Sequence, residues 1–408
     1  MTLLCHNLMN NILDFIPDNS RYLNNFQQSC KLFKSTVQSR LDDIFWTTLE
    51  EFLGKKNCEG LKNNTLKKLI IPRYNVWDKR RWARCSPIEC SPMHLECLYS
   101  ILKQNTYIEE IEFSQGTSFK YSEDKKVAQI LKTNTTLRSI EYSRMYVSVK
   151  PFCDALKHNT TLKELSFYGN AWGSMNIYAI SQMLKVNSSL ESLCLSESGV
   201  DNNGLKLLAS ALKENSSLKY LGLGTSDEFG IESIIELAKS LKINKSLTSL
   251  SLGCNENGFG DDADKIANAM AKMLQYNSTL EYLDLSLGRI TGVGVTKLAI
   301  GLKNNKSLKD LQLRYCKAGD DGARAIGWLL KHNTTLKSLD LYDNYIGNKG
   351  AMYLYHGMVE NNTLESITFS PESEDAPEIE WQTWNLLREL AEQKENLIIH
   401  HGFGHDPI

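Results

Sequence analysis

Four residues of types that bind zinc lie close together in the first quarter of the chain: Cys85, Cys90, His94 and Cys97. Thiolate and imidazole are good zinc ligands, but their spacing here matches no paired zinc template. His94 and Cys97 also fall on an expected helix, so we predict free structural thiols rather than a metal centre. Solvated side chains are expected for three histidines near the C-terminus, His400, His401 and His405.

The sequence motifs of common catalytic and nucleotide sites are missing. No G-x-x-x-x-G-K-[ST], H-E-x-x-H or G-x-S-x-G motif occurs. Gly222, Gly224 and Gly230 fall across a repeated strand and the loop after it, which is not the strand–turn–helix setting of a phosphate site. We therefore predict that the protein is not an enzyme and that it holds no cofactor and no metal.

The composition is typical of a soluble folded protein. Of 408 residues, 42% are hydrophobic and 23% are charged, which is too apolar for a disordered chain. The formal net charge of −2 and the absence of a long apolar run favour neither nucleic acid nor membrane as a partner. Ten scattered cysteines without a recognisable export signal predict reduced thiols in the cytoplasm or nucleus, or in a host cytosol if the chain is a secreted effector.

One template recurs along most of the chain: an asparagine, two small polar residues, and leucines spaced three and then two residues apart. The asparagines of the clear copies are Asn159, Asn187, Asn215, Asn244, Asn277, Asn305, Asn333 and Asn361. Most copies follow one another at 28 or 29 residues, and such a period is the signature of a solenoid. Because N-x-[ST] falls at a fixed point of the repeat, we interpret it as structural rather than as a set of glycosylation sites.

Each unit changes its hydrophobic period along its length. Leu336, Leu339 and Leu341 end in alternate spacing, which predicts a short strand. Residues 343–350, rich in glycine and asparagine, predict a turn, and the apolar spacing over 351–358 predicts a helix. A strand joined through a helix to the next parallel strand is a right-handed crossover, so the predicted fold is an α/β solenoid of repeated strand–helix units.

These units resemble leucine-rich repeats of the ribonuclease-inhibitor type over roughly residues 47–370. The resemblance rests on the L-x-x-L-x-L strands and on an asparagine or cysteine three places after the last leucine, as at Asn170, Asn255, Cys316 and Asn344. It implies a horseshoe with a parallel sheet on the concave face and helices on the convex face. The local turn is in doubt in copies that have another residue there: Ser198, Ser226 and Gly288.

Residues 1–46 lie outside the repeat, and their apolar spacing predicts short helices, the first ended by Pro17–Asn19. The segment resembles an F-box, the motif that docks a Skp-type adaptor of cullin–RING ubiquitin ligases. Cys5 stands where that family usually has proline, and Asn7 where it usually has an acid. The resemblance implies adaptor contacts by Leu8, Ile12, Leu13, Ile16, Pro17 and Leu23. The alternative is that these helices only cap the solenoid.

An insertion at 72–92 and a cap at 371–408 interrupt and end the repeat. The insertion carries five basic residues and one acid over 73–84, with candidate partner contacts at Trp77, Arg80 and Trp82. It could equally cover the first repeats, and without a wider basic stripe it does not favour nucleic acid. In the cap, one helical face is expected to carry Trp381, Trp384, Leu387 and Leu390, and 397–399 could add a last strand.

The variable positions of L-x-x-L-x-L point inward on a horseshoe and form the candidate binding face. They are acidic at first, including Glu110 and Glu112, and then small from 192 to 253. Tyrosines are enriched at the centres of protein interfaces, and acidic residues predict a basic partner. The candidate partner-binding residues are Glu141, Glu164, Tyr168, Tyr220, Tyr282, Asp284, Arg314, Asp340 and Tyr342.

Three functions fit these features. The first is the substrate-recognition subunit of a Skp–cullin–F-box type ubiquitin ligase, which holds a protein on the concave face. The second is a plain binding or inhibitor protein, a monomer when unbound, whose N-terminal helices only cap the solenoid. The third, a GTPase-activating protein similar to the Ran type, would use Arg144 after a strand, but the acidic run near the C-terminus is short.

Overall fold

The computed structural model describes residues 68–71, 99, 102–103, 106, 108–113, 121–143, 147–170, 174–224, 229–254, 258–369 and 378–400. The chain divides into two compact units, 1–67 with 89–108, and 68–88 with 109–408. The predicted adaptor contacts lie outside the described residues. So do the following side chains singled out above: Trp77, Arg80, Trp82, Cys85, Cys90, His94, Cys97, Arg144, Ser226, Asn255, His401 and His405.

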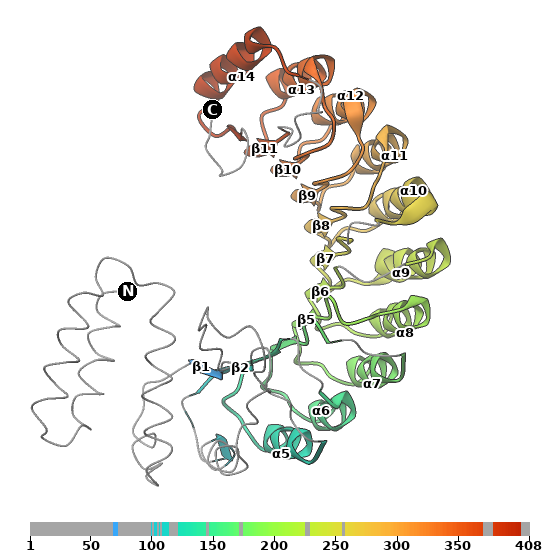
Figure 1. The fold of residues 1–408 in the computed structure, drawn as a ribbon, viewed down its shortest axis with the longest axis vertical. Coiled ribbons are helices and arrows are strands. Elements are labelled where there is room, and N and C mark those ends of the chain that lie inside the picture. The colour runs from blue at the N-terminus through green and yellow to red at the C-terminus, as the bar shows by residue number, and fades with distance from the viewer. Residues whose placement is uncertain are drawn as a thin grey trace, which may run out of the picture. The chain divides into compact units, whose positions relative to one another are not determined.

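Short parallel strands in the second unit form a twelve-stranded sheet whose order follows the sequence. Figure 1 shows the strands along the inner side of this unit and the helices along its outer side. The strands are β1 (Lys68–Ile71), β2 (Glu110–Phe113), β3 (Ser139–Tyr142), β4 (Glu164–Ser166), β5 (Ser192–Cys194), β6 (Tyr220–Gly222), β7 (Ser249–Ser251), β8 (Tyr282–Asp284), β9 (Asp310–Gln312), β10 (Ser338–Asp340), β11 (Ser366–Thr368) and β12 (Ile398–His400). The predicted α/β solenoid of strand–helix units is confirmed.

A helix follows most strands, as the change of hydrophobic period predicts. The helices are α5 (Tyr121–Leu131), α6 (Val149–Leu156), α7 (Ser174–Leu184), α8 (Asn202–Leu212), α9 (Ile231–Ile243), α10 (Ala263–Leu274), α11 (Gly292–Leu302), α12 (Gly319–Leu330), α13 (Asn348–Glu360) and α14 (Trp381–Gln393), with a 3-10 turn η3 (Gly260–Asp262) before α10. Each helix packs on the helix of the next coil.

The core lies between the sheet and the helices, and its layers are the repeated leucines. In most of the three-residue strands the central residue is buried and its two neighbours are half-buried or exposed, as at Leu193 in β5. Aromatic residues replace the third leucine in the first described coils, where the ring of Tyr142 stacks on Phe113 at 4.6 Å and on Phe167 at 5.8 Å. Larger side chains therefore occupy the same layer position without changing the strand register.

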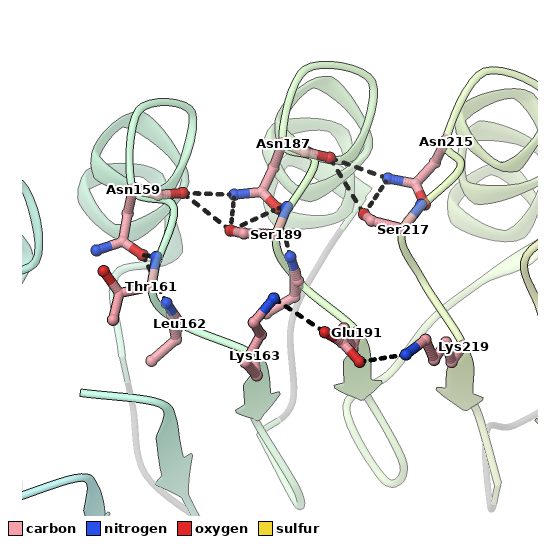
Figure 2. Close-up of polar contacts among 11 residues, drawn as sticks. Asn159, Thr161, Leu162, Lys163, Asn187, Ser189, Glu191, Asn215, Ser217 and Lys219 are labelled. Carbon is pink, nitrogen blue, oxygen red and sulfur yellow. Dashed lines mark hydrogen bonds and ion pairs between the residues drawn. The ribbon is translucent and has the colours of Figure 1, made fainter. Parts of the chain in front are cut away.

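The repeated asparagines form a ladder of hydrogen bonds between coils (Figure 2). Asn187 Nδ2 donates to the carbonyl oxygens of Leu156 at 2.6 Å and Asn159 at 3.1 Å, both in the previous coil. Its Oδ1 accepts from the backbone N–H groups of Ser189 at 3.0 Å and Leu190 at 2.7 Å. Each of the other repeat asparagines is buried, and its Nδ2 likewise donates to a leucine carbonyl of the previous coil. These hydrogen bonds support the interpretation of N-x-[ST] as structural.

A second position that can donate a hydrogen bond to the previous coil lies just after the strand, and different side chains occupy it in different coils. Asn344 Nδ2 donates to the carbonyl of Leu313 at 2.6 Å. Where the sequence departs from asparagine, Ser198 Oγ donates to the carbonyl of Phe167 at 2.5 Å and keeps this bond between coils. Gly288 has no side chain for the bond, and a Cβ there would lie 2.7 Å from the ring of Phe259.

The C-terminal coil differs in part from the expected cap. Strand β12 pairs in parallel with β11, and Trp384 of α14 stacks on Phe369 at 5.7 Å. Leu387 and Leu390 are buried, but Trp381 is 68% exposed. The prediction that Trp381 shares the buried face is therefore wrong, because it is the first residue of the helix and precedes the turn that packs on the solenoid.

Candidate protein-binding face

The face of the sheet away from the helices, here called the open face, carries two rows of side chains fixed by strand register, and a third row of positions follows the ends of the strands. The first row is Glu164, Ser192, Tyr220, Ser249, Tyr282, Asp310 and Ser338, and the second is Ser166, Cys194, Gly222, Ser251, Asp284, Gln312 and Asp340. The third row follows the strands: Tyr168, Ser196, Gly224, Gly253, Ser286, Arg314 and Tyr342. Eight of the nine described candidate residues lie in these rows, and the ninth, Glu141 of β3, pairs with Ser166 of the second row.

Two half-buried tyrosines stand on this face with one strand between them. Tyr220 and Tyr282 both pair with Ser249 of β7. The ring of Tyr220 lies over Gly222, since a Cβ there would be 2.7 Å from the phenol oxygen. Burial raises the pKa of Tyr220 and, together with the carboxylates of Asp284 and Asp310, that of Tyr282. Both phenols are therefore protonated near neutral pH and able to donate a hydrogen bond.

Asp284 and Asp310 lie beside these tyrosines. Asp284 Oδ2 accepts from Ser251 Oγ at 2.9 Å, and its Oδ1 accepts from the backbone N–H of Ser286 at 2.9 Å. Asp310 Oδ1 accepts from Gln312 Nε2 at 2.6 Å. Burial, with a smaller contribution from Asp284, raises the pKa of Asp310 above its ordinary value. A cationic group brought to this part of the face would be attracted to both carboxylates.

Arg314 is the basic residue in these rows, and its charge is partly compensated. Its guanidinium is 3.5 Å from Asp340 Oδ2 and lies over the ring of Tyr342, 4.9 Å from the centroid. Tyr342 is only 2% exposed, packed edge-on against Tyr315 at 5.5 Å. The prediction that Tyr342 borders an accessible surface is therefore wrong, because the ring lies in the layer below Arg314 and supports it.

The acidic residues of the first coils extend this face. Glu164 is exposed, and Glu141 accepts from Ser143 Oγ at 2.5 Å. Tyr168 donates to Glu197 Oε1 at 2.5 Å. Glu197 was not predicted as a site residue, because it follows the strand at a turn position where the other described coils have Gly169, Cys254, Leu287, Tyr315 and Asp343. Its positive φ of 56° places it in the turn.

The face offers hydrogen-bond donors and carboxylates but little that resembles a metal centre. Across the described ranges, no three His, Cys, Asp or Glu side chains come together as a metal site. In the same part of the chain no helix combines the length and the apolar character needed to cross a bilayer. His400, expected to be solvated, is half-buried in β12.

Comparison with known proteins agrees with the repeat. A family model described as "Leucine Rich repeat" matches residues 276–299, 304–327 and 332–354. Among solved structures, the chain is similar to leiomodin-1 actin-binding site 2, at 21% identity over 40% of this chain and 91% of that one, with a TM-score of 0.31. It is also similar to the tropomodulin C-terminal domain of Caenorhabditis elegans, at 15% identity over 39% and 93%, with a TM-score of 0.33. The matched repeats, together with the parallel sheet of one strand per coil, are consistent with a solenoid of leucine-rich repeats.

Proposed function

We propose that the protein is a binding scaffold whose open face holds a protein partner with a basic segment. The observation that carries this proposal is the group of half-buried tyrosines and carboxylates on β6 to β10. Tyr220 and Tyr282 supply large rigid contact areas and hydrogen-bond donors. Asp284 and Asp310 are partly desolvated, so a lysine or arginine placed between them would interact more strongly than at a fully exposed site.

The small residues between the tyrosines leave room for such a segment. Ser249 separates the two tyrosines, and Gly253 lies so close to Asp284 that a Cβ would be 3.1 Å from its Oδ2. A larger side chain at Gly253 would therefore cover the carboxylate. An extended basic segment lying across these strands could reach Asp284 and the more acidic first coils together.

The test is selection of binding segments from a displayed library of protein fragments, using the full chain as bait. We expect basic segments that bind more weakly at high salt. Binding should be lost with Tyr282→Ala plus Asp310→Asn and kept with the matched pair Tyr178→Ala plus Asp321→Asn, both exposed on helices. Equal binding by the two double variants would exclude the open face as the site.

We further propose that the N-terminal segment holds a Skp-type adaptor, which would make the protein a substrate-recognition subunit of a ubiquitin ligase. The F-box-like pattern of Leu8, Leu13 and Pro17 supports this. The full chain should co-purify with a Skp-type adaptor, and Leu13→Asp should abolish that capture while the open face still binds its segment. If the adaptor is never captured, and deletion of 1–46 leaves every activity intact, the plain binding or inhibitor protein is correct.

A further inference from the structure

The edge of the sheet where helices end and strands begin collects basic side chains. We define the asparagine edge as the nine segments 132–138, 157–163, 185–191, 213–219, 242–248, 275–281, 303–309, 331–337 and 359–365, each centred near a ladder asparagine. The ladder holds these segments side by side, since Asn305 Nδ2 donates to the carbonyl of Asn277 at 3.1 Å and Asn333 Nδ2 to that of Asn305 at 3.3 Å.

The charge of this edge differs sharply from that of the whole chain. The nine segments contain fourteen basic and five acidic residues, a net charge of +9, whereas the chain carries −2. All but one of the basic residues are lysines. Lysine at a helix C-terminus is favoured by the helix dipole. That reason does not cover Lys245 and Lys306, which follow the ladder asparagine outside the helices.

Part of this charge is neutralised locally and part is not. Glu191 pairs with both Lys163 at 2.9 Å and Lys219 at 2.6 Å (Figure 2). In the described part of the chain, four lysines of neighbouring coils form no ion pair: Lys242, Lys245, Lys303 and Lys306. Two of the four lie over aromatic rings instead, Lys242 at 4.7 Å from the centroid of Tyr276 and Lys303 at 5.3 Å from that of Trp328. These four charges are available to an anionic partner.

Apolar side chains protrude along the same edge. The residue before the ladder asparagine is exposed and apolar in three coils, with Val186 61% exposed, Ile243 58% and Tyr276 66%. Exposed apolar side chains of this size, placed together with lysines, indicate a surface that binds a partner.

We propose that the asparagine edge docks on an anionic lipid surface. Lysine is a strongly hydrated point charge and lacks the planar fork with which arginine reads bases or grips one phosphate. Valine and isoleucine gain by entering the lipid interface but cannot serve as stacking platforms for nucleic-acid bases. The ligand class is therefore a membrane with acidic phospholipid headgroups, and this surface is separate from the open face and independent of the function proposed for it.

The experiment is co-sedimentation of the full chain with phosphatidylcholine vesicles, with and without phosphatidylserine. We expect binding only to the anionic vesicles, reduced by salt. Each lysine near such a surface contributes roughly fivefold to partitioning, so Lys→Glu at 242, 245, 303 and 306 together should weaken it by at least about a hundredfold. The matched control reverses four exposed lysines elsewhere: Lys265, Lys297, Lys317 and Lys349.

Ile243→Ser with Tyr276→Ser separates the apolar contribution, and should weaken vesicle binding while leaving the salt dependence unchanged. Circular dichroism of every variant shows whether the solenoid remains folded. The proposal is overturned if wild-type protein binds neutral and anionic vesicles equally, if the two fourfold variants bind alike, or if a single-stranded oligonucleotide competes the protein off the vesicles.

Discussion

The contribution of the asparagine ladder to stability can be tested with two adjacent asparagines, Asn304 and Asn305. Asn305 is buried. Its Nδ2 donates to the carbonyls of Leu274 at 2.8 Å and Asn277 at 3.1 Å, and its Oδ1 accepts from the N–H groups of Ser307 at 3.0 Å and Leu308 at 2.7 Å. Asn304, its neighbour, is exposed. Asn305→Ala removes four hydrogen bonds, whereas Asn304→Ala makes the same chemical change on the surface.

The expected loss follows from the groups left behind. A hydrogen bond contributes about 1 kcal/mol net, and a buried group left without a partner costs about 1–3 kcal/mol. Because local relaxation and water recover part of this cost, we expect Asn305→Ala to lower the free energy of unfolding by about 3–5 kcal/mol. Asn304→Ala should change it by less than about 0.5 kcal/mol.

The assay is urea unfolding followed by circular dichroism, with amide hydrogen exchange to locate the effect. Exchange should increase first in the coils that contain Leu274 and Leu308, because each coil is stabilised by its neighbours. Asn305→Asp, which keeps the acceptor but turns a second oxygen toward the two carbonyls, should be at least as destabilising as Asn305→Ala. Equal stability of the Asn304 and Asn305 alanine variants would refute the structural role of the ladder.

Three further predictions concern packing and titration. Gly301→Ala should destabilise by about 1–3 kcal/mol in urea unfolding, because its Cβ would lie 2.5 Å from the carbonyl oxygen of Ala271, whereas Ile300→Ala on the exposed side of α11 should cost much less. Burial raises the pKa of the Cys316 thiol to about 11, so the folded chain holds this proton more tightly than the unfolded chain. Its contribution to stability is therefore complete below pH 9 and falls as the pH rises toward 11, and Cys316→Ala should remove that part of the pH dependence. Glu191→Gln should cost only about 0.5 kcal/mol by the same measurement, since this carboxylate and its lysine partners are partly exposed and their ion pairs are screened by water.

The fold was predictable because the same strand–helix pattern recurs many times along the chain. A single L-x-x-L-x-L segment is ambiguous, but regular copies with a helical run after each one allow only a solenoid. The effect of a different residue at a repeat position was harder to predict, because the sequence shows which residue is present but not which hydrogen bond it makes. At Ser198 the serine keeps the bond between coils, whereas at Gly288 the ring of Phe259 lies where a side chain would project.

The candidate face was predictable only in part. Alternation within a strand places Tyr220, Tyr282 and Asp284 on one face, and the register confirms it. Beyond the end of a strand the alternation no longer decides which way a side chain points. Tyr342 occupies such a position and is buried, whereas Arg314, one coil earlier at the equivalent position, stays half-exposed.

In a solenoid, residues that are far apart in the sequence can form one charged surface, as they do at the asparagine edge. The lysines that form it are spread over seven of the nine segments, so they make no basic run in the sequence, and the net charge of −2 conceals +9 on one edge and −11 elsewhere. The acidic residues of the open face account for part of the difference. Because every strand begins at the asparagine edge and runs away from it, the open face stands beside that edge and not behind it. Binding of a lipid surface at the edge would therefore leave the open face accessible to a protein partner.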